Sequence, residues 1–520
     1  MSNTTNVKRA AVASLMDQLR ADVTEQKLTP QEELEILEKL KVYGRTVTGS
    51  DAIYSSEGIV FLAEVAFRPK NPDSSREALR CLANALYLDR QMVQYFIDAG
   101  YVEKTSEAYK SENVDDEFLL GRILFFSTTF AKDDHLINKW ANEHHLVENN
   151  IAAISRHAIA YTAAASTASS LAVPMMQTMA LQDTLKLLYT LTTKLSDVST
   201  MLGPTIPHLL TLLSALPIQS SPLQAPTHHI LDALSNIPPT TPDSQTSFFP
   251  PSNPTLHVSK ILKILDKSAV IPSSSSSSSS STTSRSGSGT SNSTTVDDFD
   301  THAASLLKLL IEIYPLSPAP VKTLLHETLL PSEKERSSPL GSTNSTTLPA
   351  RLLRLASSPT TTNTRLILQT LLFVISDEDP VKFVKNVGYG HASGYLMMRG
   401  IPIPSEALEE IGAAESGDGV SSRNKRINPI TGQYLDDELR DIEASGLKGL
   451  EDMTDEEKER EAEKLFVLFE RLNRTGVINV ENPVRTAMQE GRFEEIKSDN
   501  EDSDDDGDNE AGKGKGKAKA

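Results

Sequence analysis

Apolar residues recur every three or four positions through most of the first 400 or so residues, and no long segment alternates strictly between apolar and polar side chains. The first spacing is that of one face of an α-helix, whereas strict alternation would indicate a half-buried strand. The clearest helical stretches are residues 32–41, 76–88, 116–130 and 183–195. Each is apolar on one side only, so each needs neighbours that cover it. We therefore predict an all-α protein.

Residues 365–376 are apolar on nearly every side, which predicts a central core helix. Helices of about 10–15 residues, separated by short breaks rich in Pro, Gly, Ser or Asn, are typical of the stacked pairs in armadillo and HEAT solenoids. Residues 77–84 also resemble the central helix of an armadillo repeat. We predict an armadillo/HEAT-like superhelical solenoid over residues 1–403.

Three stretches interrupt the helical rhythm, at residues 217–257, 273–299 and 332–347. Pro, Ser and Thr dominate them, and little apolar surface is available there to offset the entropy of ordering. We predict that they are loops or disordered insertions within the solenoid. Residues 404–452 are polar and glycine-rich, which indicates a flexible connector.

A second helical element is predicted beyond the connector, in residues 453–493. Thr454 and Glu457 have the spacing of a capping box, in which each side chain bonds the backbone N–H of the other residue. The predicted helix is amphipathic and must dock on a partner surface; its apolar face carries Leu465, Leu468, Phe469 and Leu472. Residues 494–520 form an acidic tail with a Lys-rich end, which we expect to be disordered.

The charge balance argues against nucleic acid as a partner. Acidic residues outnumber basic ones 70 to 51, giving a formal net charge of −19, whereas phosphate binding needs clustered Lys and Arg. Cys81 is the one cysteine in the sequence, so neither an intrachain disulfide nor a Cys-based zinc site can form. No apolar run approaches the length of about 20 residues needed to span a bilayer. We expect a soluble protein of a reducing cytosol, without a transmembrane segment.

The motifs of common catalytic sites are absent from the sequence. Neither a Gly-x-x-x-x-Gly-Lys-Ser/Thr phosphate loop nor a Gly-x-Ser-x-Gly elbow occurs. Residues 502–507 open like an EF-hand calcium loop, but Lys513 stands where a bidentate Glu is required. His135, His144 and His145 are interpreted as surface histidines rather than metal ligands. We expect no catalytic residue, no metal ion and no cofactor.

An ordered series of motifs in the last third of the chain resembles one known family. Residues 382–390 read Lys-Phe-Val-Lys-Asn-Val-Gly-Tyr-Gly, residues 428–432 read Asn-Pro-Ile-Thr-Gly, and residues 453–462 read Met-Thr-Asp-Glu-Glu-Lys-Glu-Arg-Glu-Ala. Together with residues 351–400, this series resembles the synembryn, or resistance-to-inhibitors-of-cholinesterase, family of Gα chaperones and guanine nucleotide exchange factors. The resemblance runs with gaps from about residue 40 to residue 493.

The resemblance implies a non-enzymatic exchange factor that binds heterotrimeric G-protein α subunits in the GDP-bound or nucleotide-free form. Such a protein assists folding of Gα and promotes GDP release by stabilising the nucleotide-free state. It would be cytoplasmic and monomeric, and Gα would recruit it to the cell cortex or the inner plasma membrane. The implied groove for the C-terminal helix of Gα has as candidate contacts Arg80, Asn84, Arg122, Lys186 and Tyr189. The capped helix near residues 454–473 and the segment that follows it, within residues 453–493, would reach the nucleotide-binding domain.

Two further predictions concern charge. Arg351 and Arg354 are expected to pair with an acidic segment of this chain and brace the solenoid. Ser498 and Ser503 each precede an acid by three residues, the spacing that acidophilic kinases of the casein type recognise.

The alternative to the exchange factor is an armadillo scaffold or cargo carrier of the importin type, without an effect on nucleotide.

Overall fold

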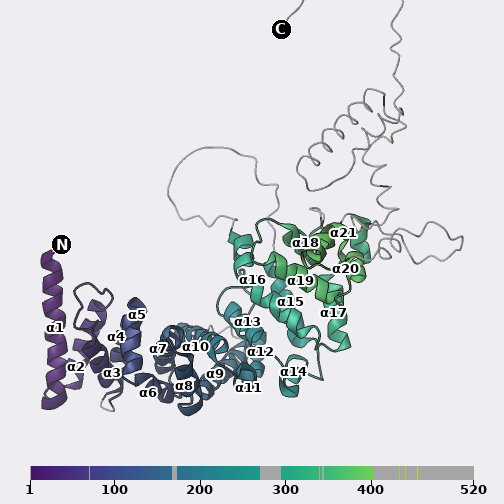
Figure 1. Ribbon diagram of the computed structural model, residues 1–520. Coiled ribbons are helices and arrows are strands. Elements are labelled where there is room, and N and C mark those ends of the chain that lie inside the picture. The colour runs from purple at the N-terminus through teal and green to yellow at the C-terminus, as the bar shows by residue number, and fades with distance from the viewer. Residues whose placement is uncertain are drawn as a thin grey trace, which may run out of the picture. The chain divides into compact units, whose positions relative to one another are not determined.

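The computed structural model describes residues 2–68, 71–166, 173–269, 294–338, 340–341 and 345–402, together with Gln433, Arg440 and Thr454. The chain divides into two units, Met1–Glu438 and Leu439–Ala520. All the helices named below belong to the first unit (Figure 1). Of the second unit, Arg440 and Thr454 alone are described.

The first half of the described chain consists of helices that follow one another closely. They are α1 (Ser2–Glu25), α2 (Pro30–Tyr43), α3 (Ser56–Ala66), α4 (Pro72–Leu88), α5 (Arg90–Asp98), α6 (Tyr101–Ala108), α7 (Val114–Phe130), α8 (Asp134–Glu143), α9 (Leu146–Ser166), α10 (Met175–Lys194), α11 (Val198–Leu202) and α12 (Ile206–Ala215). A 3₁₀-helix, η1 (Gly203–Thr205), joins the last two.

The second half continues in the same way. Its helices are α13 (Thr227–Asn236), α14 (Pro242–Phe248), α15 (Leu256–Ser268), α16 (Thr294–Ile313), α17 (Ala319–Leu329), α18 (Leu348–Ser357), α19 (Arg365–Ile375), α20 (Pro380–Val387) and α21 (Tyr389–Met398), with a 3₁₀-helix η3 (Glu333–Ser337) between α17 and α18. The described residues contain helices and no strands, so the all-α prediction is confirmed.

Two rows of helices run through the first unit. One row, which we call the ladder, consists of α2, α4, α7, α10, α13, α16 and α19, each in contact with the next. The second row, α3, α5, α6, α9, α12 and α15, packs against the ladder. Stacked pairs of helices in which one row covers the other are the arrangement of armadillo and HEAT solenoids. The predicted solenoid class is therefore confirmed.

The ladder helices begin where the sequence supplies capping side chains. Thr29 and Glu32 form a capping box at the start of α2, with Thr29 N donating to Glu32 Oε2 over 2.9 Å. Asn71 caps α4 and is followed by Pro72, and Asn113 caps α7 by accepting two backbone N–H groups. These side chains satisfy donors that the first helical turn leaves without a partner.

Helix α7 is buried on almost all sides because α4, α5, α6 and α10 all contact it. Three consecutive residues, Phe118, Leu119 and Leu120, are all buried and point to different sides of the helix. Gly121 lies where the ring of Tyr109 crosses the helix, and a Cβ at that position would come within 3.2 Å of the ring. A larger residue at this position would therefore have to displace the buried Tyr109 ring by a few tenths of an ångström.

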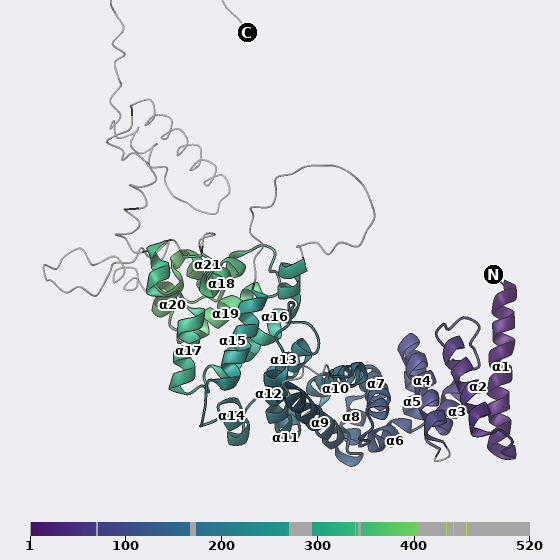
Figure 2. The same cartoon turned by 180° about the vertical axis from the view of Figure 1, so that it is seen from behind.

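Helix α19 occupies the interior predicted for it. It contacts α16, α17, α18, α20 and α21, and Figure 2 shows it among these helices. Leu368, Leu371 and Ile375 are fully buried, while Leu366 is 44% exposed. The core-helix prediction is confirmed, with Leu366 as the exception.

The predicted loop at residues 217–257 is wrong in part, because the segment contains α13 and α14. Pro242 stands at the first turn of α14, where its missing N–H costs nothing. In α13, Ile230, Leu231 and Leu234 recur at helical spacing and are fully buried. The surrounding prolines obscured this short pattern.

The other two predicted insertions also contain helical residues. Helix α16 begins at Thr294, inside the stretch 273–299, and η3 lies within 332–347. The predictions for residues 273–293, for the connector at 404–452 and for the tail concern segments that lie almost entirely outside the described residues.

Among the described helices, each is too short or too polar to cross a lipid bilayer.

A single carboxylate joins the last two helices of the ladder. Asp300 of α16 is 7% exposed and accepts hydrogen bonds from the backbone N–H groups of Asn363 (3.1 Å) and Thr364 (2.9 Å), just before α19. The Thr364 hydroxyl donates to the same carboxylate over 2.8 Å. Burial opposes ionisation of Asp300, but these hydrogen bonds outweigh it and hold the pKa of Asp300 below its ordinary value.

We predict that Asp300→Asn lowers the free energy of unfolding at pH 7 by about 1–3 kcal/mol, because buried N–H groups lose their charged acceptor. Since the folded-state pKa is depressed, the stabilisation is present above the unfolded pKa, about 3.9, and is lost as the pH falls through the folded pKa. Urea unfolding between pH 7 and pH 3 should show the gap between the wild-type protein and D300N narrowing with acid. Asp17→Asn, whose side chain is 73% exposed, should show almost no gap at any pH. A D300N gap independent of pH would contradict the assignment.

Candidate functional site

The five candidate contact residues lie on three consecutive ladder helices. Arg80 and Asn84 are one turn apart on α4, Arg122 lies on α7, and Lys186 and Tyr189 lie on α10. All five side chains are half-buried or exposed, next to fully buried leucines of the same helices. We call the solvent-facing strip that contains these residues the ladder face.

Asp183 fixes two of the candidate bases. Its side chain is 4% exposed and pairs with Arg122 Nε (2.7 Å) and with Lys186 Nζ (3.1 Å). The Arg122 guanidinium also lies 4.2 Å from the centroid of the Phe118 ring, a cation–π contact. Arg122 and Lys186 remain about one-third exposed, at 34% and 35%. A buried acid of α10 therefore holds two bases at the surface.

Glu77 of α4 likewise pairs with two bases. Its side chain is 7% exposed and pairs with Arg80 of the same helix and with Lys41 Nζ of α2, the latter over 2.6 Å. Arg80 is 33% exposed. The candidate bases of the ladder face are thus held by ion pairs within the chain, and substituting them disturbs the fold as well as the surface.

Polar links of this kind continue along the ladder. Arg76 Nε of α4 pairs with Asp116 of α7 over 2.6 Å, and this hydrogen bond raises the pKa of Arg76. Asn236 of α13 donates to Thr192 Oγ1 of α10 (3.2 Å) and accepts from Lys308 Nζ of α16 (3.3 Å). Neighbouring ladder helices are thus connected by side-chain hydrogen bonds in addition to apolar contact.

A buried polar network centred on Glu117 connects α7 with α9 and α10. Glu117 Oε1 lies 2.6 Å from His157 Nε2 and accepts from the Thr184 hydroxyl (3.2 Å), while Arg156 donates to Oε2 over 3.0 Å. Burial opposes ionisation, but His157 and Arg156 hold the pKa of Glu117 below its usual value. The side chains of Glu117 and His157 are 4% and 1% exposed, so no substrate reaches them. This network therefore joins the three helices in the interior of the fold.

Tyr87 belongs to the ladder face but was not among the sequence candidates. It is 70% exposed, lies one turn after Asn84 on α4, and its ring packs against Phe126 of α7 with centroids 5.8 Å apart. Tyr189 of α10 is 43% exposed. The spacing of three residues from Asn84 could have identified Tyr87, since it places both on one side of the helix.

The predicted basic brace lies on α18. Arg351 pairs with the Asp266 carboxylate, and its Nη1 donates to the carbonyl oxygens of Asp266 (2.7 Å) and Ala269 (3.2 Å) at the end of α15. Arg354 donates to the Ser345 carbonyl oxygen over 2.8 Å. Burial, together with the charge of Arg351, lowers the pKa of Arg354. Arg351 thus caps the C-terminus of α15, where helical carbonyls favour a cation.

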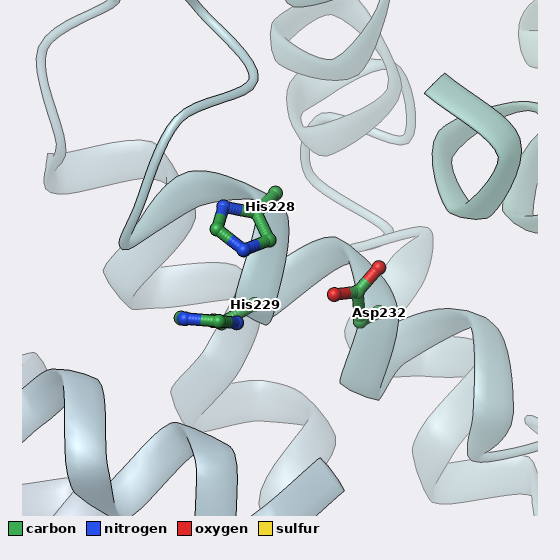
Figure 3. A group of neighbouring side chains, drawn as sticks. All are labelled: His228, His229 and Asp232. Carbon is green, nitrogen blue, oxygen red and sulfur yellow. The ribbon is translucent and has the colours of Figure 1, made fainter. Parts of the chain in front are cut away.

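A group of histidines on α13 was not singled out from the sequence. His228, His229 and Asp232 present ligand-type atoms that all lie within 4.8 Å of one another (Figure 3). The His228 ring is 3.8 Å from the His229 ring and 4.9 Å from that of His302 on α16, measured between centroids. Burial lowers the pKa of His229 to about 3, with added contributions from His228, Lys186 and His302. Consecutive histidines with an acid one turn later are the signal that the sequence offered.

The histidines considered in the sequence analysis lie apart from this group. His144 Nδ1 is 3.0 Å from a Glu107 oxygen, and His145 Nδ1 is 2.9 Å from a Glu148 oxygen. His135 lies in the first turn of α8. His144 and His145 therefore contact different carboxylates.

A comparison of the sequence with known protein families shows to which family the chain belongs. Residues 36–492 match the family described as "Guanine nucleotide exchange factor synembryn" (Ric8). This chain belongs to the synembryn family. The match begins within α2 and continues through α21, so it includes the ladder face, the Glu117 network and the histidines of α13.

Curated relatives show a more local likeness to this synembryn-family chain. "Chaperone Ric-8A" of Mus musculus is 33% identical over 119 residues, which is 22% of this chain and 21% of the relative. "Chaperone Ric-8A" of Danio rerio is 36% identical over 109 residues, 21% of this chain and 18% of the relative. The chain thus spans about a fifth of the length of the curated relatives that it matches.

Solved structures add nothing to the family assignment. An engineered protein whose crystal structure aligns with 78% of this chain and 95% of its own has 12% sequence identity and a TM-score of 0.31, too low to carry an argument. The remaining synembryn-like predictions lie outside the described residues. These are the apolar face of Leu465, Leu468, Phe469 and Leu472 and the candidate phosphosites Ser498 and Ser503.

We predict that Asp183→Asn lowers the free energy of unfolding by about 1–3 kcal/mol, because two charged donors lose a buried carboxylate. Tyr189→Ala on the same helix should change it by less than about 0.5 kcal/mol, as is usual for a surface substitution. Urea unfolding at pH 7 measures both. Equal stabilities of D183N and Y189A would show that Asp183 does not fix the ladder face.

Proposed function

We propose that this chain binds G-protein α subunits, assists their folding and promotes GDP release by stabilising the nucleotide-free state. The observation that carries the proposal is the synembryn family match over residues 36–492, which includes nearly the whole described solenoid. The name "Chaperone Ric-8A" of the relatives supports the folding role. The chain would act as a monomer in the cytoplasm, and Gα would recruit it to the membrane.

Nucleotide release of this kind needs no catalytic group. A protein that binds nucleotide-free Gα more tightly than the GDP form shifts the equilibrium by that difference in affinity. A 100-fold preference corresponds to about 2.7 kcal/mol. The same preference makes the protein a chaperone, because it stabilises a Gα conformation that is poorly stable alone. GTP binding then favours a Gα state with lower affinity and releases the protein.

We propose the ladder face as the docking surface for the C-terminal helix of Gα. Tyr87 and Tyr189 offer exposed aromatic rings, a residue type that often dominates binding energy at interfaces. Asn84, which lies between Arg80 and Tyr87 on α4, offers a half-buried amide. Arg80, Arg122 and Lys186 are already oriented by Glu77 and Asp183, so little side-chain entropy remains to be lost on binding.

The direct test measures dissociation of a fluorescent GDP analogue from purified Gα subunits of several classes, with and without the full-length chain. We expect faster release for at least one class, together with co-purification of a nucleotide-free complex. Binding without faster release would instead support the armadillo scaffold, and no binding to any Gα would reject both the partner and the activity.

The docking surface is tested with the double variant Tyr87→Ala and Tyr189→Ala. Truncating an aromatic anchor costs about 2 kcal/mol, so we expect Gα affinity to fall at least about 30-fold and GDP release to slow accordingly. Ile159→Ala is the matched control, because Ile159 is 68% exposed but lies on α9 of the second row. This control should bind as the wild-type protein does.

These substitutions are preferable to charge reversal of Arg80 and Lys186. Reversal would place an acid beside buried Glu77 or Asp183, so a loss of binding could follow from unfolding. If the tyrosine double variant binds Gα with unchanged affinity, the docking surface lies elsewhere than on the ladder face, even if GDP release by the wild-type protein is confirmed.

The segment at residues 450–493 is proposed to contact the nucleotide-binding domain of Gα. Because its sequence pattern is that of an appended amphipathic helix, deleting it should reduce exchange activity more than it reduces soluble yield. GDP release and the soluble fraction after expression are measured in parallel. Equal losses of both would make the segment part of the folded core.

A further inference from the structure

We propose that His228, His229 and Asp232 form a binding site for a borderline divalent cation of the Zn²⁺ type, which His302 of the next ladder helix closes as fourth ligand. Three of the ligands come from five consecutive residues of α13, and the fourth comes from α16. The site lies in the part of the ladder that joins α10, α13 and α16. It is independent of the proposed action on Gα.

The geometry allows one ion to bind the three side chains of α13. Their ligand atoms lie within 4.8 Å of one another, whereas ligands of a tetrahedral Zn²⁺ at 2.0–2.1 Å lie about 3.3 Å apart. Rotation about the side-chain bonds can shorten the separations between the ligand atoms to this value, because all three side chains are half-buried and not fixed in the core. His228 and Asp232 are one helical turn apart, so they lie on the same side of α13. Figure 3 shows the Asp232 carboxylate beside the two imidazole rings.

The charges around the site also favour a metal ion. The positive neighbour Lys186 is paired with Asp183 over 3.1 Å, which reduces its repulsion of a cation. Among the described residues, the Asp232 carboxylate enters no ion pair, so its charge is available.

The donor set selects the kind of ion. Three imidazoles and one carboxylate suit Zn²⁺ and similar transition metals, whereas Mg²⁺ and Ca²⁺ prefer oxygen ligands. The His302 ring lies 4.9 Å from that of His228 between centroids, which is close enough for both to reach one ion. Four protein ligands make a closed site, the pattern of structural rather than catalytic zinc. The ion would therefore link α13 to α16, helices that Asn236 and Lys308 already connect.

The test is a Zn²⁺ titration of the EDTA-treated full-length protein in competition with a chromophoric chelator. We expect one tight equivalent in the wild-type protein, with affinity at least about tenfold weaker in His229→Gln, Asp232→Asn and His302→Gln. His145→Gln is the matched control, because His145 is 65% exposed and pairs with Glu148; its affinity should equal that of the wild-type protein. Mg²⁺ and Ca²⁺ should not displace the bound Zn²⁺.

Thermal unfolding supplies a second readout, with far-UV circular dichroism confirming that each variant is folded. Zn²⁺ should raise the Tm of the wild-type protein and of H145Q, and not that of D232N, because a ligand that binds the folded state stabilises it. Absence of a tight equivalent, or the same stoichiometry and affinity in H229Q and D232N as in the wild-type protein, would overturn the site. Unchanged affinity in H302Q alone would overturn its closure by α16.

Discussion

Each inner helix of the ladder, from α4 to α16, must bury both flanks against its ladder neighbours and its back against the second row. On α10, Leu181, Leu185, Leu188 and Leu191 are fully buried in this way, and each contributes about 1.5–3 kcal/mol relative to an exposed side chain. One strip along each helix is then left for solvent. Any side chain that meets a partner from the ladder must come from that strip, so the packing requirement itself selects the few residues of α4, α7 and α10 that are available for recognition.

Buried acids determine how the bases of that strip are presented. Glu77 and Asp183 are almost fully covered, and a covered carboxylate is tolerated only when charged donors pair with it. Each therefore recruits two bases, one of them from the preceding ladder helix, and the outer parts of Arg80, Arg122 and Lys186 remain at the surface. The same ion pairs thus connect neighbouring helices and orient the candidate docking surface. Exposed Tyr87 and Tyr189 take no part in these ion pairs, which makes them the more selective probes of binding.

Local patterns were sufficient where a helix is long and one-sided, as in α2 and α4, and where it is apolar all round, as in α19. Helix α7 was expected to be apolar on one side only, but the structure buries it on almost all sides. Local patterns were insufficient in residues 217–257, because α13 and α14 are short and prolines surround them. For the candidate site, the sequence identified three bases, an asparagine and a tyrosine that lie on one strip. The pairs Glu77–Arg80 and Asp183–Lys186 have a spacing of three residues within one helix. The sequence did not reveal that Lys41 and Arg122 join them, because these bases lie on other helices and meet the acids only through the contacts of α2 with α4 and of α7 with α10.

The sequence by itself determined the helical class, the capping of individual helices and the family to which the chain belongs, because these depend on spacing and residue type within short segments. The tertiary structure alone decided which polar side chains are buried, which bases of neighbouring helices they bind, and that His228 and His229 of α13 come close to His302 of α16. The physical reason is that burial and ion pairing depend on distances between helices that are far apart in the chain, and no local pattern encodes those distances.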